Sequence, residues 1–400
     1  MNFDNIAATG FPLAFKVRQG ARAATVAGHA PARDVFHIQA RTMGTGGHQK
    51  EVLVTEGAGG TVWRVVSDEG ANLNGTDLAP FPLAFYNAGL HGDFVNRALA
   101  IARVRGVPLA IDGVNIDNQY YFNGSFFRGT GEGSAEAVAV RVSARSSASR
   151  ESVLRVLDEA LAASPAHATL ALPQRNTFAL YVNGRRCPVS RVAQSTAADE
   201  IDPFKAHGKA PVPLAGSAAP FEIIERIVRD NPAGPPSTMP ADGRVPITIP
   251  GASTMRDAAG LVSTLVAHRS GAAFRITSDE RPAVDDAPSG LANIAAAIAF
   301  CYMTQFTRYI EYRKHKVRAI RFVQTLPFTL SGNAADGTLA GGLEPVDTHV
   351  FLHAEEPDEV MQNLLEVAEN TCYLHAALRG TLPGRVELCL GGIAATARAA

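Results

Sequence analysis

The sequence has few cysteines and little net charge of either sign. Its 400 residues include four cysteines, too few and too widely spaced for the disulfide framework of a secreted domain, and none stands in a CxxC or Cys/His zinc pattern. The charges nearly cancel to a formal net charge of −1, and no run of Lys and Arg forms a basic arm. We therefore expect a protein of a reducing compartment, with no metal site and no nucleic-acid partner.

Long apolar runs are also missing. No stretch approaches eighteen apolar residues, and the first residues lack the basic start and unbroken apolar core of a secretion signal. The sequence thus predicts a cytoplasmic protein without a membrane partner. Four hundred residues with 46% apolar content exceed what one core usually holds, which predicts two or more domains.

An internal repeat divides the chain. Val62 to Glu69 (VWRVVSDE) returns as Ala273 to Glu280 (AFRITSDE), 211 residues later. Arg141 to Leu170 aligns without a gap on His349 to Leu378, 208 residues later, and both segments contain an apolar strand, a polar turn and an amphipathic helix. Repetition of this size predicts two homologous domains.

Each half reads as strands, a long buried helix, more strands, a second amphipathic helix and a closing strand, which is an α+β pattern. The predicted domains are residues 1–190 and 244–400. Between them, residues 191–243 are rich in Pro, Ala and Gly and predict a surface linker. Within this linker we expect a short helix from Pro220 to Asn231, because Ile223, Ile224 and Ile227 would share one helical face.

Two predicted helices of the second half each carry a thiol. Ala287 to Arg313 has apolar residues at three- and four-residue steps, no Pro or Gly after Gly290, and Ser289 as a candidate N-cap; it contains Cys301. Pro357 to Leu378 is predicted as a single helix that carries Cys372. A buried Cys is most often a small core hydrophobe, so the pairing of two such helices is the informative feature.

This arrangement, with the repeated SDE segment before each first helix, resembles the OsmC/Ohr family of thiol-dependent hydroperoxide reductases. The resemblance covers both halves. It implies two tandem OsmC-like domains that form a pseudo-dimer, each a sheet packed on two long central helices, in a protein that is a monomer or a homodimer. It also implies that Cys301 and Cys372 reduce organic hydroperoxides as a redox pair, with an external dithiol reductant and no cofactor. In the first half Asp93 and Ser164 stand where these thiols would be.

The group that activates a peroxidatic thiol is the open part of this interpretation. Only the thiolate attacks a peroxide, and burial in an apolar helix disfavours ionisation. The family's reductases use an early Arg and a Glu near the start of the first Cys helix, but Ala287 to Phe300 contains no Glu. A positive charge must then come from another part of the chain, or from further along the same helix. The candidates are Arg256, its repeat partner Arg33, Arg308 and His375.

A second interpretation is a hydrolase or small-molecule-binding protein on the same scaffold. Its site would use polar residues of the thiol-free half, or Cys301 as nucleophile with His375 as base. Gly89 and Gly92 are expected to interrupt the first long helix and open a pocket there. Cys187 and Cys389 are interpreted as structural. The candidate residues of the thiol-free half are His91, Asp93, Ser164 and His167.

Overall fold

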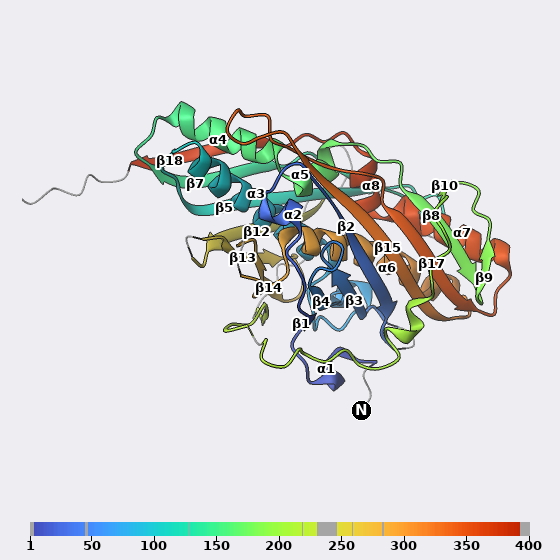
Figure 1. Ribbon diagram of the computed structural model, residues 1–400. Helices are drawn as coiled ribbons and strands as arrows, with labels where there is room; N and C mark the ends of the chain where they lie inside the picture. The colour runs from blue at the N-terminus through green and yellow to red at the C-terminus, as the bar shows by residue number, and fades with distance from the viewer. Residues whose placement is uncertain are drawn as a thin grey trace, which may run out of the picture.

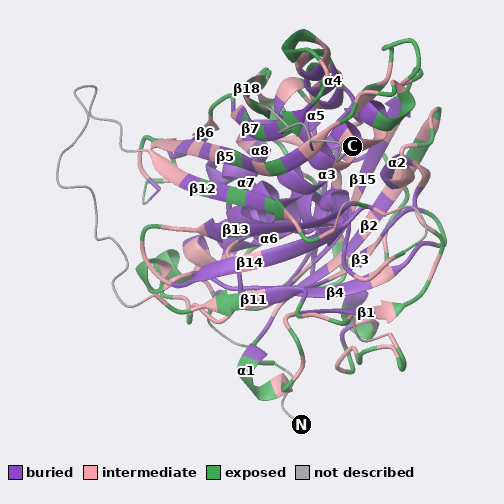
Figure 2. Cartoon of the chain, turned by 90° about the vertical axis from the view of Figure 1, so that its left-hand side faces the viewer, coloured by how far each residue is buried: buried purple, intermediate pink, exposed green. Residues whose placement is uncertain are grey.

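The structure, a computed structural model, describes residues 4–44, 47–126, 128–217, 219–229, 246–257, 259–281 and 284–392 (Figure 1). This part of the chain forms two β-sheets and eight α-helices, so the predicted α+β class is confirmed. Buried residues gather on the central helices and on the strand faces that cover them, while exposed residues lie mainly on connections (Figure 2).

The first sheet takes strands from both halves of the chain. Its order is β1-β4-β3-β2-β15-β17-β8-β10, with β16 beside β15 and β9 beside β8. The junction is the antiparallel pair β2–β15, in which Arg41 lies opposite Arg321 and Ala32 opposite Leu330. The bounds are β1 Ala14–Arg18, β2 Ala32–Thr42, β3 Lys50–Thr55, β4 Val62–Ser67, β8 Thr177–Val182, β9 Arg185–Cys187, β10 Ala193–Gln194, β15 Val317–Ser331, β16 Ala340–Leu343 and β17 Asp347–Ala354.

The second sheet also takes strands from both halves of the chain. Its order is β11-β14-β13-β12-β5-β7-β18, with β6 beside β5. The junction is the antiparallel pair β12–β5, and β18 closes the sheet parallel to β7. The bounds are β5 Ala110–Asn123, β6 Glu132–Ala135, β7 Ala139–Ser146, β11 Ile224–Ile227, β12 Ile247–Met255, β13 Leu261–Ala267, β14 Ala273–Asp279 and β18 Arg385–Gly392.

Helices and strands recur along the chain at the offset read from the sequence. The helices α5 (Pro165–Ala171) and α8 (Tyr373–Arg379) differ in both bounds by 208 residues, as do β7 and β17. The same offset relates the first residues of α3 (Pro82–Val104) and α6 (Gly290–Arg313), and of α4 (Arg150–Ala162) and α7 (Asp358–Thr371). The fold therefore supports the internal repeat. Short helices complete the set: α1 Ile6–Thr9, α2 Ala24–Ala27, and the 3-10 turns Ala71–Leu73 and Pro203–Lys205.

The long helices α3 and α6 pack on each other between the sheets, α3 against the second sheet and α6 against the first. The predicted helix from Ala287 to Arg313 is confirmed as α6. The Ser289 hydroxyl accepts a hydrogen bond from the Ala292 amide at 3.1 Å, which satisfies one free N–H of the first turn. The helix ends at Arg313 and is followed by its C-cap Lys314, whose φ of 55° is left-handed.

Gly89 and Gly92 do not interrupt α3, so that prediction is wrong. They allow close approach instead. A Cβ on Gly89 would lie 2.6 Å from the Gly290 carbonyl oxygen of α6, and one on Gly92 would lie 2.3 Å from the Ser278 hydroxyl. The contact that these glycines permit between α3, α6 and β14 outweighs their low helix propensity.

The predicted single helix from Pro357 to Leu378 is also wrong in one respect, because the chain breaks at Cys372. This residue has extended backbone angles and separates α7 from α8. Ser164 has the same position between α4 and α5, where Pro165 follows and disfavours helical angles in the preceding residue. Tyr373 replaces that proline in the second half and the break persists, so packing rather than local sequence maintains it.

The linker contains a strand where a helix was predicted. Residues Ile224–Ile227 form β11, which pairs antiparallel with β14. The open edge of β14 supplies backbone partners, and β-branched isoleucines suit a strand, so tertiary pairing overrides the helical spacing. Residues 230 and 231 of the predicted helix lie outside the described part of the chain.

The helix α6 is long and apolar enough to cross a membrane by length and composition alone. Of its most apolar window, 94% is buried inside the fold, as expected for the core helix of a soluble protein.

Candidate active site

Cys301 and Cys372 lie side by side in the core. The Sγ atoms are 3.4 Å apart, and both side chains are buried. A disulfide has an S–S bond of about 2.05 Å, so a closure of little more than 1 Å would join them. Cys301 is held in the rigid middle of α6, whereas Cys372 occupies the break between α7 and α8.

A small cavity of about 130 Å³ opens onto Cys301 but not onto Cys372. Both halves of the chain line it. Its wall combines apolar side chains with a few polar ones, which is typical of ligand sites. The first half contributes Glu69, Gly70, Asn72, Leu73, Asp77, Phe81, Pro82 and Leu83, and the second half Ile247, Ile249, His268, Ser270, Cys301, Thr304, Gln305, Arg308 and Tyr373.

A charged cluster lies one helical turn beyond Cys301. The Thr304 hydroxyl is 2.6 Å from both the Lys50 ammonium and a Glu69 carboxylate oxygen, and Lys50 donates to the same carboxylate at 3.1 Å. The Lys50 side chain is completely buried. Residues i and i+3 share a helix face, so the cluster and the Cys301 thiol are neighbours.

Lys50 and Glu69 were missed as site residues by the sequence reasoning. Glu69 ends the repeated SDE segment, and that repeat was the signal that could have found it. Lys50 gives no such signal. It begins a predicted strand in which apolar and polar residues alternate, and a lysine at the end of such a strand is usually exposed to solvent.

Arg308 is the candidate cation that does line the cavity. Its guanidinium lies 4.5 Å from the centre of the Phe126 ring and donates to the Gln305 side chain at 3.1 Å. No carboxylate pairs with Arg308 in the ion pairs of the described residues. The half-buried guanidinium is therefore a positive charge in the cavity lining with no carboxylate partner among the described residues.

Arg256 and Arg33 do not line the cavity over Cys301. Arg256 follows the last residue of β12, so it lies seven residues, roughly 23 Å along an extended strand, beyond the cavity residue Ile249. Its guanidinium packs 4.7 Å from the centre of the Phe221 ring. Arg33 forms an exposed two-pronged ion pair with Glu344 at 2.6 and 2.7 Å, and this partner raises the pKa of Arg33.

His375 is packed among aromatic rings rather than placed as a base. Its ring centre lies 4.6 Å from that of Tyr302 and 5.5 Å from that of Phe178, and neither ring nitrogen has a hydrogen-bond partner in the described residues. Burial lowers the pKa of His375 to about 3, so the imidazole is neutral near pH 7. Burial also raises the pKa of Cys372 well above its ordinary value, which keeps this thiol protonated.

In the thiol-free half Asp93 and Ser164 form a direct hydrogen bond. The Ser164 hydroxyl donates to Asp93 Oδ2 at 2.6 Å, and His167 Nδ1 lies 3.0 Å from the same hydroxyl. Arg97 donates to Asp93 Oδ1 at 2.9 Å. The order is Asp–Ser–His, whereas a catalytic serine donates to a histidine that the aspartate orients. The arrangement is that of a buried polar core.

His91 completes this half-site. Its Nδ1 lies 2.8 Å from the Ser253 hydroxyl, and its Nε2 has no partner among the described residues. Burial lowers the pKa of His91 to about 3 and that of His167 to about 4. In the part of the chain that the structure describes, no three His, Cys, Asp or Glu side chains are grouped to hold a metal ion. Cys187 is buried and Cys389 exposed, and both are free thiols.

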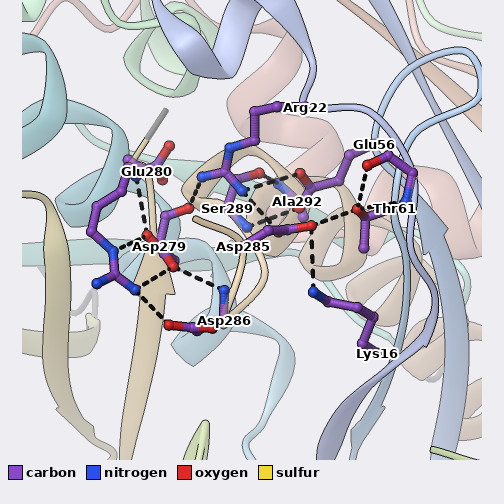
Figure 3. Close-up of polar contacts among 12 residues, drawn as sticks. Lys16, Arg22, Glu56, Thr61, Asp279, Glu280, Asp285, Asp286, Ser289 and Ala292 are labelled. Atoms are coloured by element: carbon purple, nitrogen blue, oxygen red, sulfur yellow. Dashed lines mark hydrogen bonds and ion pairs between the residues drawn. The ribbon is translucent and has the colours of Figure 1, made fainter. Parts of the chain in front are cut away.

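A polar network joins the two halves at the start of α6 (Figure 3). Glu56 accepts a hydrogen bond from the Ser289 amide at 2.9 Å, and Arg22 donates to Asp285 at 2.9 Å. Burial raises the pKa of Glu56 to about 7, with Arg22 opposing the rise and Asp285 adding to it.

Glu280 lies beside this network and accepts from the Gly290 amide. Burial, and next the charge of Asp93, raise the pKa of Glu280 to about 8. Two protonatable carboxyl groups therefore meet the amino end of the helix that carries Cys301.

The fold and the site define an α+β protein with two buried thiols in contact, one of which, Cys301, lines a small cavity formed by both halves of the chain. Residues 283–387 match the model of the OsmC-like protein family, and this stretch contains Cys301 and Cys372. A solved OsmC-like hydroperoxide resistance protein from Jannaschia sp. CCS1 is similar at 20% identity, over 31% of this chain and 80% of that one, with a TM-score of 0.21. No curated protein matches the chain.

Proposed function

We propose that the protein is a thiol peroxidase that reduces organic hydroperoxides, with Cys301 as the attacking thiol and Cys372 as the resolving thiol. The observation that carries this proposal is the 3.4 Å contact between the two Sγ atoms, with Cys301 alone reaching the cavity. The solved OsmC-like protein named above is described as a hydroperoxide resistance protein, which agrees with the proposal.

The chemistry balances with a dithiol as reductant. The Cys301 thiolate attacks the terminal oxygen of the hydroperoxide, the O–O bond breaks, and the alkoxide leaves and takes a proton to become the alcohol. The Cys372 thiol then attacks the sulfenic sulfur, forming the disulfide and releasing water. An external dithiol reduces the disulfide and is itself oxidised.

Lys50, Glu69 and Thr304 are proposed to fill the role expected of Arg256 and the missing Glu. The buried ammonium places a positive charge near the nucleophile, which favours the thiolate. Glu69 and the Thr304 hydroxyl fix that ammonium by hydrogen bonds at 3.1 and 2.6 Å.

We further infer that residues 1–190 and 244–400 are two OsmC-like domains forming a pseudo-dimer in the cytoplasm. The recurrence of helices and strands at one offset and the two sheets that mix strands of both halves support this inference. The Asp–Ser–His order in the thiol-free half gives no support to the hydrolase alternative.

The test uses tert-butyl hydroperoxide with dithiothreitol as reductant. The hydroperoxide should remove two thiols per chain, and peptide mass mapping should find a Cys301–Cys372 disulfide. Cys301→Ser should abolish turnover, and Cys372→Ser should leave a sulfenic acid that dimedone traps. Cys187→Ser and Cys389→Ser are the matched controls and should retain activity. Turnover at the wild-type rate in Cys301→Ser would refute the proposal.

A further inference from the structure

The cavity over Cys301 is small for the site of an organic substrate. Its volume is about 130 Å³. An apolar protein cavity of about 150 Å³ accommodates one benzene molecule. A substrate that fits entirely inside must therefore be no larger than a compact branched alkyl group with its peroxide.

The walls are parts of the packed core. Leu83 and Ile249 are buried side chains of the main hydrophobic cluster, and the Tyr373 ring lies 5.5 Å from that of Tyr120. Protein interiors are close-packed, so such walls retreat only when neighbouring side chains move as well. Phe81, like Leu73 and Ile247, is only partly buried, and its ring packs edge-on against His268 at a ring distance of 6.0 Å.

The lining residues that solvent reaches, taken together as the mouth, are mostly polar and include Asn72, Ser270 and Arg308. A bulky apolar group that projects through this mouth would cover polar groups and gain little burial in return.

We propose that the site selects compact alkyl hydroperoxides and discriminates against bulky aromatic ones, with Phe81 as the residue that sets the limit. This inference rests on the proposed peroxidase function. Phe81 precedes Pro82, the first residue of α3, and makes no side-chain cap, so its ring can be removed without uncapping the helix.

The test compares kcat/KM for tert-butyl, tert-amyl and cumene hydroperoxides, each divided by its rate with free cysteine to remove intrinsic reactivity. We expect wild-type protein to prefer the tert-butyl compound over the cumene compound by at least about tenfold, with the tert-amyl compound between them. Phe81→Ala should remove most of that preference. Phe221→Ala, a half-buried phenylalanine outside the cavity, is the matched control and should keep the preference.

Equal or faster reaction of wild-type protein with cumene hydroperoxide would overturn the size limit while leaving the peroxidase function intact. The wild-type series decides this even if Phe81→Ala fails to fold. Reaction with none of the three compounds would refute the peroxidase function, and the size limit with it.

Discussion

Replacing Lys50 by Met tests both the stability and the chemistry proposed for the charged cluster beside Cys301. The Lys50 side chain has no exposed surface, and its ammonium pairs with Glu69 at 3.1 Å. Removal of one partner from a buried ion pair typically costs about 3–5 kcal/mol, because the other charge remains buried without compensation. We expect Lys50→Met to lower the free energy of unfolding by about that amount in urea denaturation.

The double variant Lys50→Met/Glu69→Gln separates stability from function. It removes both charges, so most of the lost stability should return. The positive charge stays absent. The Glu69 charge is removed with it, so the two effects on the thiolate partly cancel, and we expect a rate reduced by about threefold to tenfold. Stopped-flow reaction with tert-butyl hydroperoxide and alkylation of Cys301 by iodoacetamide should both slow accordingly.

Lys16→Met is the matched control. Lys16 is also buried and faces a carboxylate, Asp285 at 3.7 Å, but it belongs to the network at the start of α6 and not to the thiol site. Its loss should change stability without changing the rate per folded molecule. A double variant that reacts at the wild-type rate would refute the role of Lys50, and one as unstable as Lys50→Met would refute the ion-pair argument.

Two further outcomes follow from the other buried polar groups. The folded protein keeps Glu56 and Glu280 protonated to about pH 7 and 8, while the unfolded chain releases these protons near pH 4.5, so stability should fall as pH rises from about 4.5 to 8. Each pKa unit between the two states contributes about 1.4 kcal/mol, and Glu280→Gln should flatten the profile of urea midpoints; an unchanged slope would contradict the assignment. Ser164→Ala should cost about 1–3 kcal/mol by removing the donor to Asp93, yet leave peroxide turnover intact, and loss of turnover in this variant would favour a functional thiol-free site.

The parts of the site that local sequence determines were predictable. The apolar period and the Ser289 cap located the helix of Cys301, and the constant offset identified the polar residues that replace the thiols in the first half. The contact between Cys301 and Cys372 could be expected from the family resemblance, but its distance could not.

The wrong predictions of helices and strands share one physical cause. Tertiary contacts override the conformational preferences of the local sequence. The Gly89 contact with α6, the pairing of β11 with β14 and the break at Cys372 all depend on residues far away in the sequence. Lys50 and Glu69 reach Thr304 across more than 230 residues, so no window of sequence contains the cluster.

The two half-sites balance their buried charges with different residues. Strand register pairs Lys50 with Ser67 in the first half, whereas Val262 pairs with Ser278 in the second, so the lysine has an apolar counterpart. Glu69 has a counterpart in Glu280, which has no lysine partner among the described residues but feels the charges of Arg22 and Arg97.

The thiol-free side therefore balances its buried carboxyl groups with other residues. Glu280 has its pKa raised to about 8 and is therefore mostly neutral at pH 7, while Asp93 obtains its counter-charge from Arg97 on the next turn of α3. On the thiol side Lys50 neutralises Glu69. Two identical chains could not hold both arrangements, because one sequence would have to place lysine and valine, and cysteine and aspartate, at the same positions. A single chain whose two halves differ in sequence can, so one half-site holds two thiols while its counterpart forms a polar core.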